Sequence, residues 1–217
     1  MKDIRLLHQL LKQQPDLCGF NVTIPFKEQI VPLMDELDEL AEKTGAVNTV
    51  QVLRNGKRIR LKGYNTDVYG FSQSLKEWFT APDTELPGQA LVLGTGGASK
   101  AVAGALSDFD IITHRVSRQQ GKGIYTTYDR LVAGDFAAHP LIVNTTPLGM
   151  FPDIGRCPAI PYQYLTEKHY LYDLVYHPEE TLFMRKGIEM GASVKNGERM
   201  LHLQADKAWE IWRTQIT

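Results

Sequence analysis

A strand, a glycine-rich turn and a helix start constrain the fold of this chain more than any other feature. The apolar run at residues 90–93 leads directly into Gly94-Thr95-Gly96-Gly97-Ala98-Ser99, and residues 100–106 continue as a small-residue helix. The spacing fits the pattern G-x-G-x-x-(small), in which the glycines form the turn and admit a pyrophosphate, and the small residue permits close helix–strand packing. The helix N-terminus adds N–H donors and a positive dipole for phosphate. We therefore expect a dinucleotide-binding unit, and a glycine turn in an unrelated α/β protein is the alternative.

Further buried strands follow the glycine turn. Apolar runs recur at residues 111–116, 141–144 and 170–175, with helical patterns between them. Strands that alternate with helices predict a parallel sheet covered on both faces. The fold class is therefore α/β.

The part of the chain before the glycine turn has a different pattern. Residues 49–53 and 58–62 flank Asn55-Gly56, and this dipeptide favours a type I′ hairpin turn. A strand is predicted at 19–24. Apolar residues at helical spacing predict helices at 3–13, from residue 31 to a C-cap at Gly45, after Asp67 and from Glu198. The last helix has an expected apolar stripe of Leu201, Ala205, Ala208, Trp209 and Trp212, and residues 81–88 favour a linker.

Composition excludes several classes of protein. The 217 residues have a formal net charge of -1, which argues against a dedicated nucleic-acid binder. No apolar run approaches the ~18 residues of a membrane helix, and the first residues have no apolar signal core. Two cysteines, Cys18 and Cys157, are too few for a disulfide framework and fit a reducing compartment. We expect a cytoplasmic protein without a membrane or nucleic-acid partner, and no cluster of metal ligands is visible.

The end of the second strand of the cofactor unit favours one cofactor over another. An acidic residue there would bind the 2′-hydroxyl of NAD, but the chain has Ser117-Arg118 followed by Lys122. Guanidinium and ammonium groups without a carboxylate suit a 2′-phosphate. The sequence therefore predicts NADP, and a solvated basic turn is the alternative.

Polar residues gather at the predicted ends of helices and strands in the first part of the chain. Asn21, Thr23 and Lys27 surround a strand-to-helix turn, Asn48 follows a helix, and Asp67 precedes one. Gln204 lies inside the apolar stripe of the last helix, where a buried amide needs partners. Each could merely cap a turn, but together they provide the groups of a polar site at element ends.

These residues lie within blocks that resemble the shikimate dehydrogenase family. The blocks are in the family's order and span nearly the whole chain. They are Asn21-Val22-Thr23-Ile24-Pro25-Phe26-Lys27, Gly45-Ala46-Val47-Asn48-Thr49, Gly63-Tyr64-Asn65-Thr66-Asp67, Gly94-Thr95-Gly96-Gly97-Ala98, Asn144-Thr145-Thr146-Pro147-Leu148-Gly149-Met150, Tyr172-Asp173-Leu174-Val175-Tyr176 and Asn196-Gly197 with Met200, Leu201 and Gln204.

The resemblance implies reversible, NADP-dependent reduction of 3-dehydroshikimate to shikimate in aromatic amino-acid biosynthesis. It implies a catalytic pair of Lys27 and Asp67. Substrate contacts are expected at Asn21, Thr23, Asn48, Tyr176 and Gln204. Cofactor contacts are expected at Gly94, Thr95, Gly96, Gly97, Ala98, Ser117, Arg118, Lys122, Leu174 and Gly197, with Ser117 and Gln119 as departures from the family's Asn-Arg-Thr block.

The resemblance also implies two domains. We expect a substrate-binding α/β domain at 1–80, a Rossmann-type NADP-binding domain at 81–197, and a helix at 198–217 that packs back on the first domain. Members of the family begin with a strand, a helix and a second strand, and a Ser-x-Ser near the first strand holds the substrate carboxylate. The first serine of this chain is Ser72, so we expect an incomplete first domain and impaired stability or activity.

Three readings stay open on the sequence. The first is an NADP-dependent shikimate dehydrogenase, acting as a monomer or homodimer. The second is a quinate or quinate/shikimate dehydrogenase, and the third is an NADP-binding fragment without turnover. Turnover of shikimate separates the first from the third, and exchange of shikimate for quinate tests the second.

Overall fold

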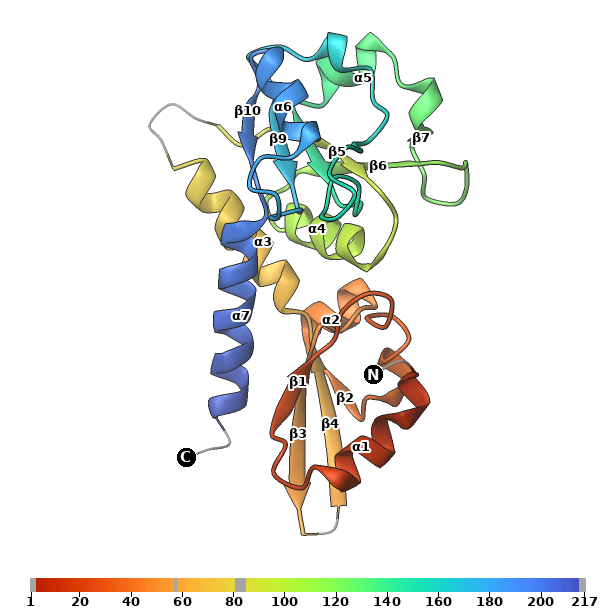
Figure 1. The fold of residues 1–217 in the computed structure, drawn as a ribbon, viewed down its shortest axis with the longest axis vertical. Helices are drawn as coiled ribbons and strands as arrows, with labels where there is room; N and C mark the ends of the chain where they lie inside the picture. Colours follow the sequence, from red (N-terminus) through yellow and green to blue (C-terminus); the bar gives the residue numbers. More distant parts are fainter. Residues whose placement is uncertain (1–2, 57, 81–84, 215–217) are drawn as a thin grey trace.

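Two α/β units, each built on its own sheet, make up the chain in a computed structural model that describes residues 3–56, 58–80 and 85–214. In Figure 1 the larger sheet lies above and the smaller sheet below. The long helices α3 (Thr66–Trp78) and α7 (Glu198–Arg213) run between the two units. No helix in the described ranges is long and apolar enough to cross a membrane.

The smaller sheet has the strand order β1-β3-β4-β2. Its centre is the antiparallel hairpin of β3 (Thr49–Asn55) and β4 (Arg58–Tyr64), flanked by β1 (Gly19–Asn21) and the parallel strand β2 (Glu36–Leu37). The short helix η1 (Ile4–Leu6) leads into α1 (Leu7–Gln13). Because Leu7 and Leu11 of α1 share one helical face, they are buried together in a core with Ile30, Val47, Val50 and Leu61.

The predicted helix from residue 31 to Gly45 is wrong over most of its length. The segment forms η2 (Val31–Leu33), then β2, and only then α2 (Glu39–Thr44). The backbone N–H groups of Asp35 and Asp38 donate to Leu61 and Gly63 of β4 at 2.9 Å, so pairing with the sheet outweighs the helical periodicity. The C-cap is confirmed, since Gly45 has φ 62°.

Two further boundaries differ from the predictions. The predicted strand at 19–24 ends at Asn21, ahead of the cis bond between Ile24 and Pro25. The predicted hairpin is present, but Asn55 still pairs with Arg58 and the turn begins at Gly56, whose φ is 58°. Asn55 therefore belongs to β3 rather than to the turn that the Asn-Gly signal predicts for it.

The larger sheet is parallel throughout and has the order β10-β9-β8-β5-β6-β7. Its strands are β5 (Gln89–Leu93), β6 (Ile112–Ser117), β7 (Thr126–Thr127), β8 (Leu141–Asn144), β9 (Tyr170–Asp173) and β10 (Ser193–Lys195). The chain order reverses beside β5, which is the doubly wound Rossmann arrangement and confirms the predicted fold class.

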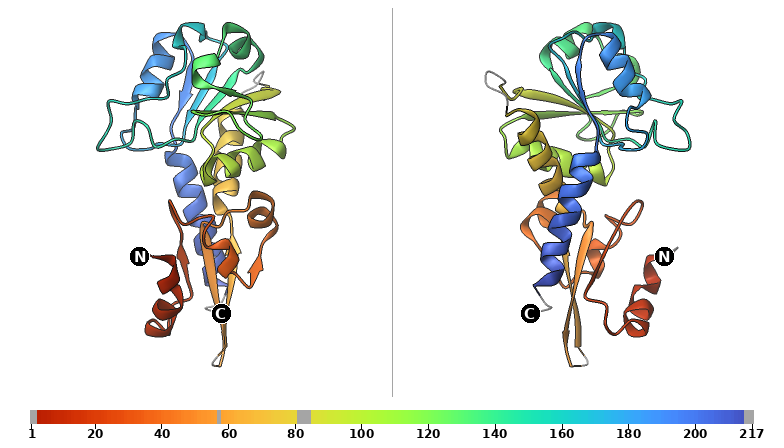
Figure 2. Two further views of the ribbon diagram at one scale, coloured as in Figure 1. Left: turned by 90° about the vertical axis from the view of Figure 1, so that its right-hand side faces the viewer. Right: turned by 60° about the vertical axis from the view of Figure 1, so that its left-hand side comes forward.

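Helices cover both faces of the larger sheet, as the two views of Figure 2 show. One buried core joins the sheet to α3 and α4 (Gly97–Ser107), and a second joins it to α5 (Ala133–Ala138) and α6 (Leu182–Glu189). Short helices η3 (Tyr128–Arg130) and η4 (Tyr162–Tyr164) lie in the connections. Of the predicted linker, residues 81–84 lie outside the described ranges and 85–88 have no helix or strand.

The α3–α7 pair determines which face of α7 is buried. A Cβ at Gly70 of α3 would lie 2.7 Å from the Met200 carbonyl oxygen, so the two helices pack too closely there for any residue larger than glycine. Met200 and Ala208 are buried, whereas Ala205 and Trp209 of the predicted stripe are exposed. The far end of α7 reaches the smaller sheet, where the Trp212 indole N–H donates to the Val50 carbonyl at 3.0 Å.

Candidate active site

A cleft of about 320 Å³ lies where elements of the two units meet. The predicted site residues Asn21, Thr23, Lys27, Asn48, Asp67, Ala98, Leu174, Tyr176, Gly197 and Gln204 all line it. They come from β1 and the turn after it, the α2–β3 loop, α3, α4, the loop after β9, and α7 with the residue before it. The topology thus brings together side chains that are far apart in the sequence.

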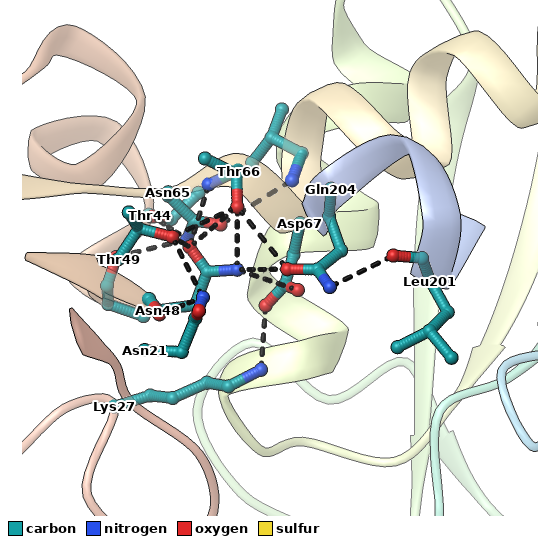
Figure 3. Close-up of polar contacts among 12 residues, drawn as sticks. Asn21, Lys27, Thr44, Asn48, Thr49, Asn65, Thr66, Asp67, Leu201 and Gln204 are labelled. Carbon is teal, nitrogen blue, oxygen red and sulfur yellow. Dashed lines mark hydrogen bonds and ion pairs between the residues drawn. The ribbon is translucent and has the colours of Figure 1, made fainter. Parts of the chain in front are cut away.

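Lys27 and Asp67 form an ion pair at the floor of the cleft. The Lys27 ammonium donates to Asp67 Oδ2 at 2.7 Å, and the two side chains are 17% and 10% exposed (Figure 3). Backbone bonds hold the lysine turn, since the Val47 N–H donates to the Lys27 carbonyl at 2.8 Å. Asp67 lies in the first turn of α3, where the helix dipole favours a carboxylate.

The Asn48 amide orients the Asp67 carboxylate. The backbone N–H of Thr66 donates to Asn48 Oδ1 at 2.7 Å, which leaves the Asn48 amide nitrogen facing Asp67. That nitrogen donates to Asp67 Oδ1 at 2.9 Å and to the Thr66 hydroxyl at 2.9 Å. Each carboxylate oxygen of Asp67 therefore has its own donor, one charged and one neutral.

The remaining predicted substrate residues surround this centre. Gln204 Oε1 lies 3.3 Å from the Asn48 amide nitrogen, so α7 reaches the same cluster. The Asn21 amide donates to the Asn48 carbonyl and the Thr49 hydroxyl, each at 3.3 Å. Thr23 and Tyr176 are exposed at the mouth of the cleft.

The glycine turn lies against the lysine. Gly94 has φ 116°, and a Cβ there would lie 2.7 Å from Thr145 Oγ1, so both backbone and space require glycine. A Cβ at Gly97 would lie 3.6 Å from Lys27 Cβ. The helix N-terminus expected to hold phosphate and the Lys27–Asp67 pair are therefore direct neighbours.

The predicted 2′-phosphate residues lie apart from the cleft. Ser117 ends β6, and Arg118 and Lys122 are exposed in the turn that follows. The positive charge of Arg118 acts on Tyr128 and lowers its pKa, but burial dominates and raises the pKa of Tyr128 to about 12. The structure thus leaves the guanidinium accessible, as an anion site at this strand end requires.

Part of one wall of the cleft, beside the predicted Leu174 and Tyr176, was not predicted from the sequence. Thr145, Thr146, Pro147 and Met150 follow β8, and Val175 follows β9. A signal was present, because polar and proline residues directly after a buried parallel strand mark the carboxyl edge of a sheet. Thr66, which braces Asn48, was also not assigned a role.

Known proteins of one family are similar to this chain in sequence. A family model described as the shikimate dehydrogenase substrate binding domain matches residues 3–50. The NADP(+) shikimate dehydrogenase of Desulforamulus reducens is 37% identical over 214 residues, covering 91% of this chain and 72% of the relative. That of Carboxydothermus hydrogenoformans is 39% identical over 208 residues, covering 89% and 71%.

Solved structures extend the comparison to the fold. Shikimate 5-dehydrogenase from Thermus thermophilus, in complex with NADP(H) and shikimate, superposes with a TM-score of 0.82 at 32% identity, covering 97% of this chain and 79% of that one. Quinate dehydrogenase from Corynebacterium glutamicum, in complex with NAD, gives 0.80 at 27% identity, covering 97% and 77%.

The fold and the cleft together define an oxidoreductase of the dinucleotide-binding α/β class. Within that class, the identity to curated relatives over most of both chains settles the family. The chain belongs to the shikimate dehydrogenase family.

Proposed function

We propose that this chain catalyses the reversible, NADP-dependent reduction of 3-dehydroshikimate to shikimate. The observation that supports the proposal most strongly is the Lys27–Asp67 ion pair. Its ammonium nitrogen and carboxylate oxygen are 2.7 Å apart, and Lys27 is adjacent to Gly97 of the glycine turn. A proton-handling pair beside a pyrophosphate-binding turn is the arrangement a hydride-transfer enzyme needs. The names of the relatives, which are NADP(+)-dependent shikimate dehydrogenases, support the choice of substrate and cofactor.

The residues present fit the cofactor. The backbone from Gly94 through Thr95, Gly96, Gly97 and Ala98 would hold the pyrophosphate at the start of α4. Ser117, Arg118 and Lys122 would hold the 2′-phosphate, and Leu174 and Gly197 would border the nicotinamide. When bound, NADP supplies the hydride chemistry.

The Lys27 ammonium donates a proton to the substrate's C3 oxygen or polarises that carbonyl, and it accepts the proton in the reverse reaction. Asp67 accepts from the ammonium at 2.7 Å and holds it in place. Asn21, Thr23, Asn48, Tyr176 and Gln204 offer the hydroxyl and amide groups that a polyhydroxy carboxylate requires.

The proposal extends to the organisation of the chain. Residues 1–80 form the substrate-binding domain, 81–197 form the NADP-binding domain, and the segment 198–217, which contains α7, returns to the first domain. Contacts of Trp212 and Ile211 with β3 support this division. Both cysteines are free, which supports a reducing, cytoplasmic compartment, and we propose a monomer or homodimer.

The experiment is a steady-state assay with NADP and shikimate. We expect measurable turnover that Lys27→Ala abolishes. If the protein binds NADP but shows no turnover in either direction, the chain is a cofactor-binding fragment and the proposed activity is wrong.

Quinate is the second candidate substrate, and the structural likeness to a quinate dehydrogenase favours testing it. Replacing shikimate with quinate in the same assay should lower kcat/KM. A higher kcat/KM for quinate than for shikimate would reverse the assignment.

A further inference from the structure

A buried carboxylate lies behind the wall of the cleft that follows β8 and β9. Asp173 is the last residue of β9, has 0% exposure and does not line the cleft. The Thr181 hydroxyl donates to its Oδ2 at 2.6 Å, and the Asn144 amide and the Val175 N–H donate to its Oδ1 at 2.8 and 3.1 Å. Each of these donors is neutral.

The three donors come from three different segments. Asn144 ends β8, and its Oδ1 accepts from the backbone N–H and the hydroxyl of Thr146 at 3.0 and 2.7 Å. Val175 belongs to the loop at 174–176, all of whose residues line the cleft. Asp173 is therefore bonded, directly or through Asn144, to both loops of this wall.

The third donor, Thr181, connects Asp173 to the start of α6. Thr181 is the N-cap of α6, and its hydroxyl also accepts from the Met184 N–H at 3.3 Å. A Cβ at Gly149 would lie 3.6 Å from Thr181 Cβ, so the loop after β8 packs against the same threonine. The start of α6 thus anchors the carboxylate to the helical layer of the larger unit.

A fully buried carboxylate without a cation in contact is costly, so its presence calls for a role. Among the described residues, Asp173 makes no salt bridge. Its oxygens accept three hydrogen bonds that converge from β8, the 174–176 loop and α6. An apolar residue at this position would leave the buried Asn144 amide without that acceptor.

We propose that Asp173 is a positioning residue that fastens the 144–150 and 174–176 loops to the start of α6, so that Thr146 and Tyr176 keep their places on the side of the cleft formed by the larger unit. The catalytic consequence rests on the proposed function. The geometric part is independent of it, because the fastening of the loops can be measured without turnover.

The test compares Asp173→Ala and Thr181→Val in the full chain. Each has a matched control away from the cleft. Asp135→Ala removes a carboxylate that accepts from the Val132 N–H and the Tyr125 hydroxyl at 2.9 and 2.8 Å, and Thr113→Val removes a buried hydroxyl without a described partner. The measurements are amide hydrogen exchange, the dissociation constant for NADP, and kcat and KM for shikimate.

We expect Asp173→Ala to speed exchange of residues 144–150 and 173–181 by about tenfold or more and to weaken NADP binding by a similar factor. Thr181→Val should produce a smaller change in the same segments. The controls should leave exchange there and kcat/KM unchanged, even where Asp135→Ala lowers Tm.

Unchanged exchange in both loops for Asp173→Ala would overturn the inference. If Asp173→Ala does not fold, unchanged exchange and NADP affinity for Thr181→Val would do so. An absence of shikimate turnover in the unmodified protein, with faster loop exchange in Asp173→Ala, would instead reject the proposed function and leave the inference standing.

Discussion

The side-chain nitrogen of Lys27 lies 2.7 Å from Asp67 Oδ2, although the lysine follows β1 and the aspartate begins α3. The loop between α2 and β3 holds both residues, because the Val47 N–H donates to the Lys27 carbonyl and the Asn48 amide donates to Asp67 Oδ1. The position of the ammonium therefore depends on the smaller unit, while its neighbour Gly97 belongs to the larger one.

The first prediction concerns this pair. Lys27→Met should lower kcat/KM for shikimate by about 10²–10⁴-fold, because a positioned proton donor contributes roughly that factor. NADP binding should change little. Lys43→Met is the matched control, since Lys43 also forms a 2.7 Å ion pair, with Asp108, but both partners are exposed. Equal activity of the two variants would contradict the role assigned to Lys27.

The second prediction concerns cofactor choice. Arg118→Ala should weaken NADP binding by about tenfold or more while NAD binding stays the same, because a charged hydrogen bond to phosphate contributes about 1.5–3 kcal/mol. Arg130→Ala serves as the control, since Arg130 is also exposed but lies in η3. An unchanged ratio of NADP to NAD affinities in Arg118→Ala would show that the 2′-phosphate binds elsewhere.

The third prediction concerns Gly197, directly before α7. A Cβ there would lie 2.1 Å from the Leu174 carbonyl oxygen, so Gly197→Ala must push α7 and the 174–176 loop apart. We expect lower Tm and at least about tenfold lower kcat/KM. Gly134→Ala in α5 meets no atom within 4 Å and should stabilise the protein by about 0.5–1 kcal/mol. Chemical denaturation of both variants measures the contrast.

The fourth prediction concerns stability and pH. Burial raises the pKa of Asp173 to about 6, above its unfolded value, so the folded state binds the proton more tightly. The contribution of Asp173 to stability is then greatest at low pH and is lost as pH rises through about 6. Its charge also raises the pKa of the Tyr162 hydroxyl, which burial already raises, so this neighbour stays neutral over the range.

Asp173→Asn removes this titration and can keep the local hydrogen bonds, because the Thr181 hydroxyl can accept from the new amide. The free energy of unfolding of the variant should therefore rise relative to wild type by about 1 kcal/mol between pH 5 and pH 8. Parallel denaturation curves at the two pH values give this difference. A constant difference between the proteins would mean that Asp173 does not titrate there.

Elements whose conformation is determined by residues nearby in the sequence could be predicted. The β5–α4 turn and α3 follow from apolar periodicity and glycine placement. The segment after residue 31 could not be predicted, because Asp35 and Asp38 give their backbone N–H groups to β4 rather than to a helix. The buried face of α7 likewise depends on Gly70 of α3, a contact between distant parts of the chain.

The site residues, too, could be predicted only in part. Polar residues at element ends indicated a cleft, and the structure brings Asn21, Lys27, Asn48, Asp67 and Gln204 together there. The roles of Thr66 and Asp173 could not be read from the pattern, since both act through other side chains. Thr66 sets the direction of an amide, and Asp173 lies behind the wall rather than on it.

Helix α7 begins directly after Gly197, against the Leu174 backbone, and near its other end Trp212 donates to Val50 of the smaller sheet. Each residue of an α-helix adds about 1.5 Å of length and about 100° of rotation. One inserted residue between these two contacts would therefore separate them further and turn Trp212 away from its acceptor. The number of residues in α7 therefore sets the distance at which the two units, and with them the two sides of the cleft, are held. Natural variants should tolerate substitutions along this helix far better than insertions or deletions within it.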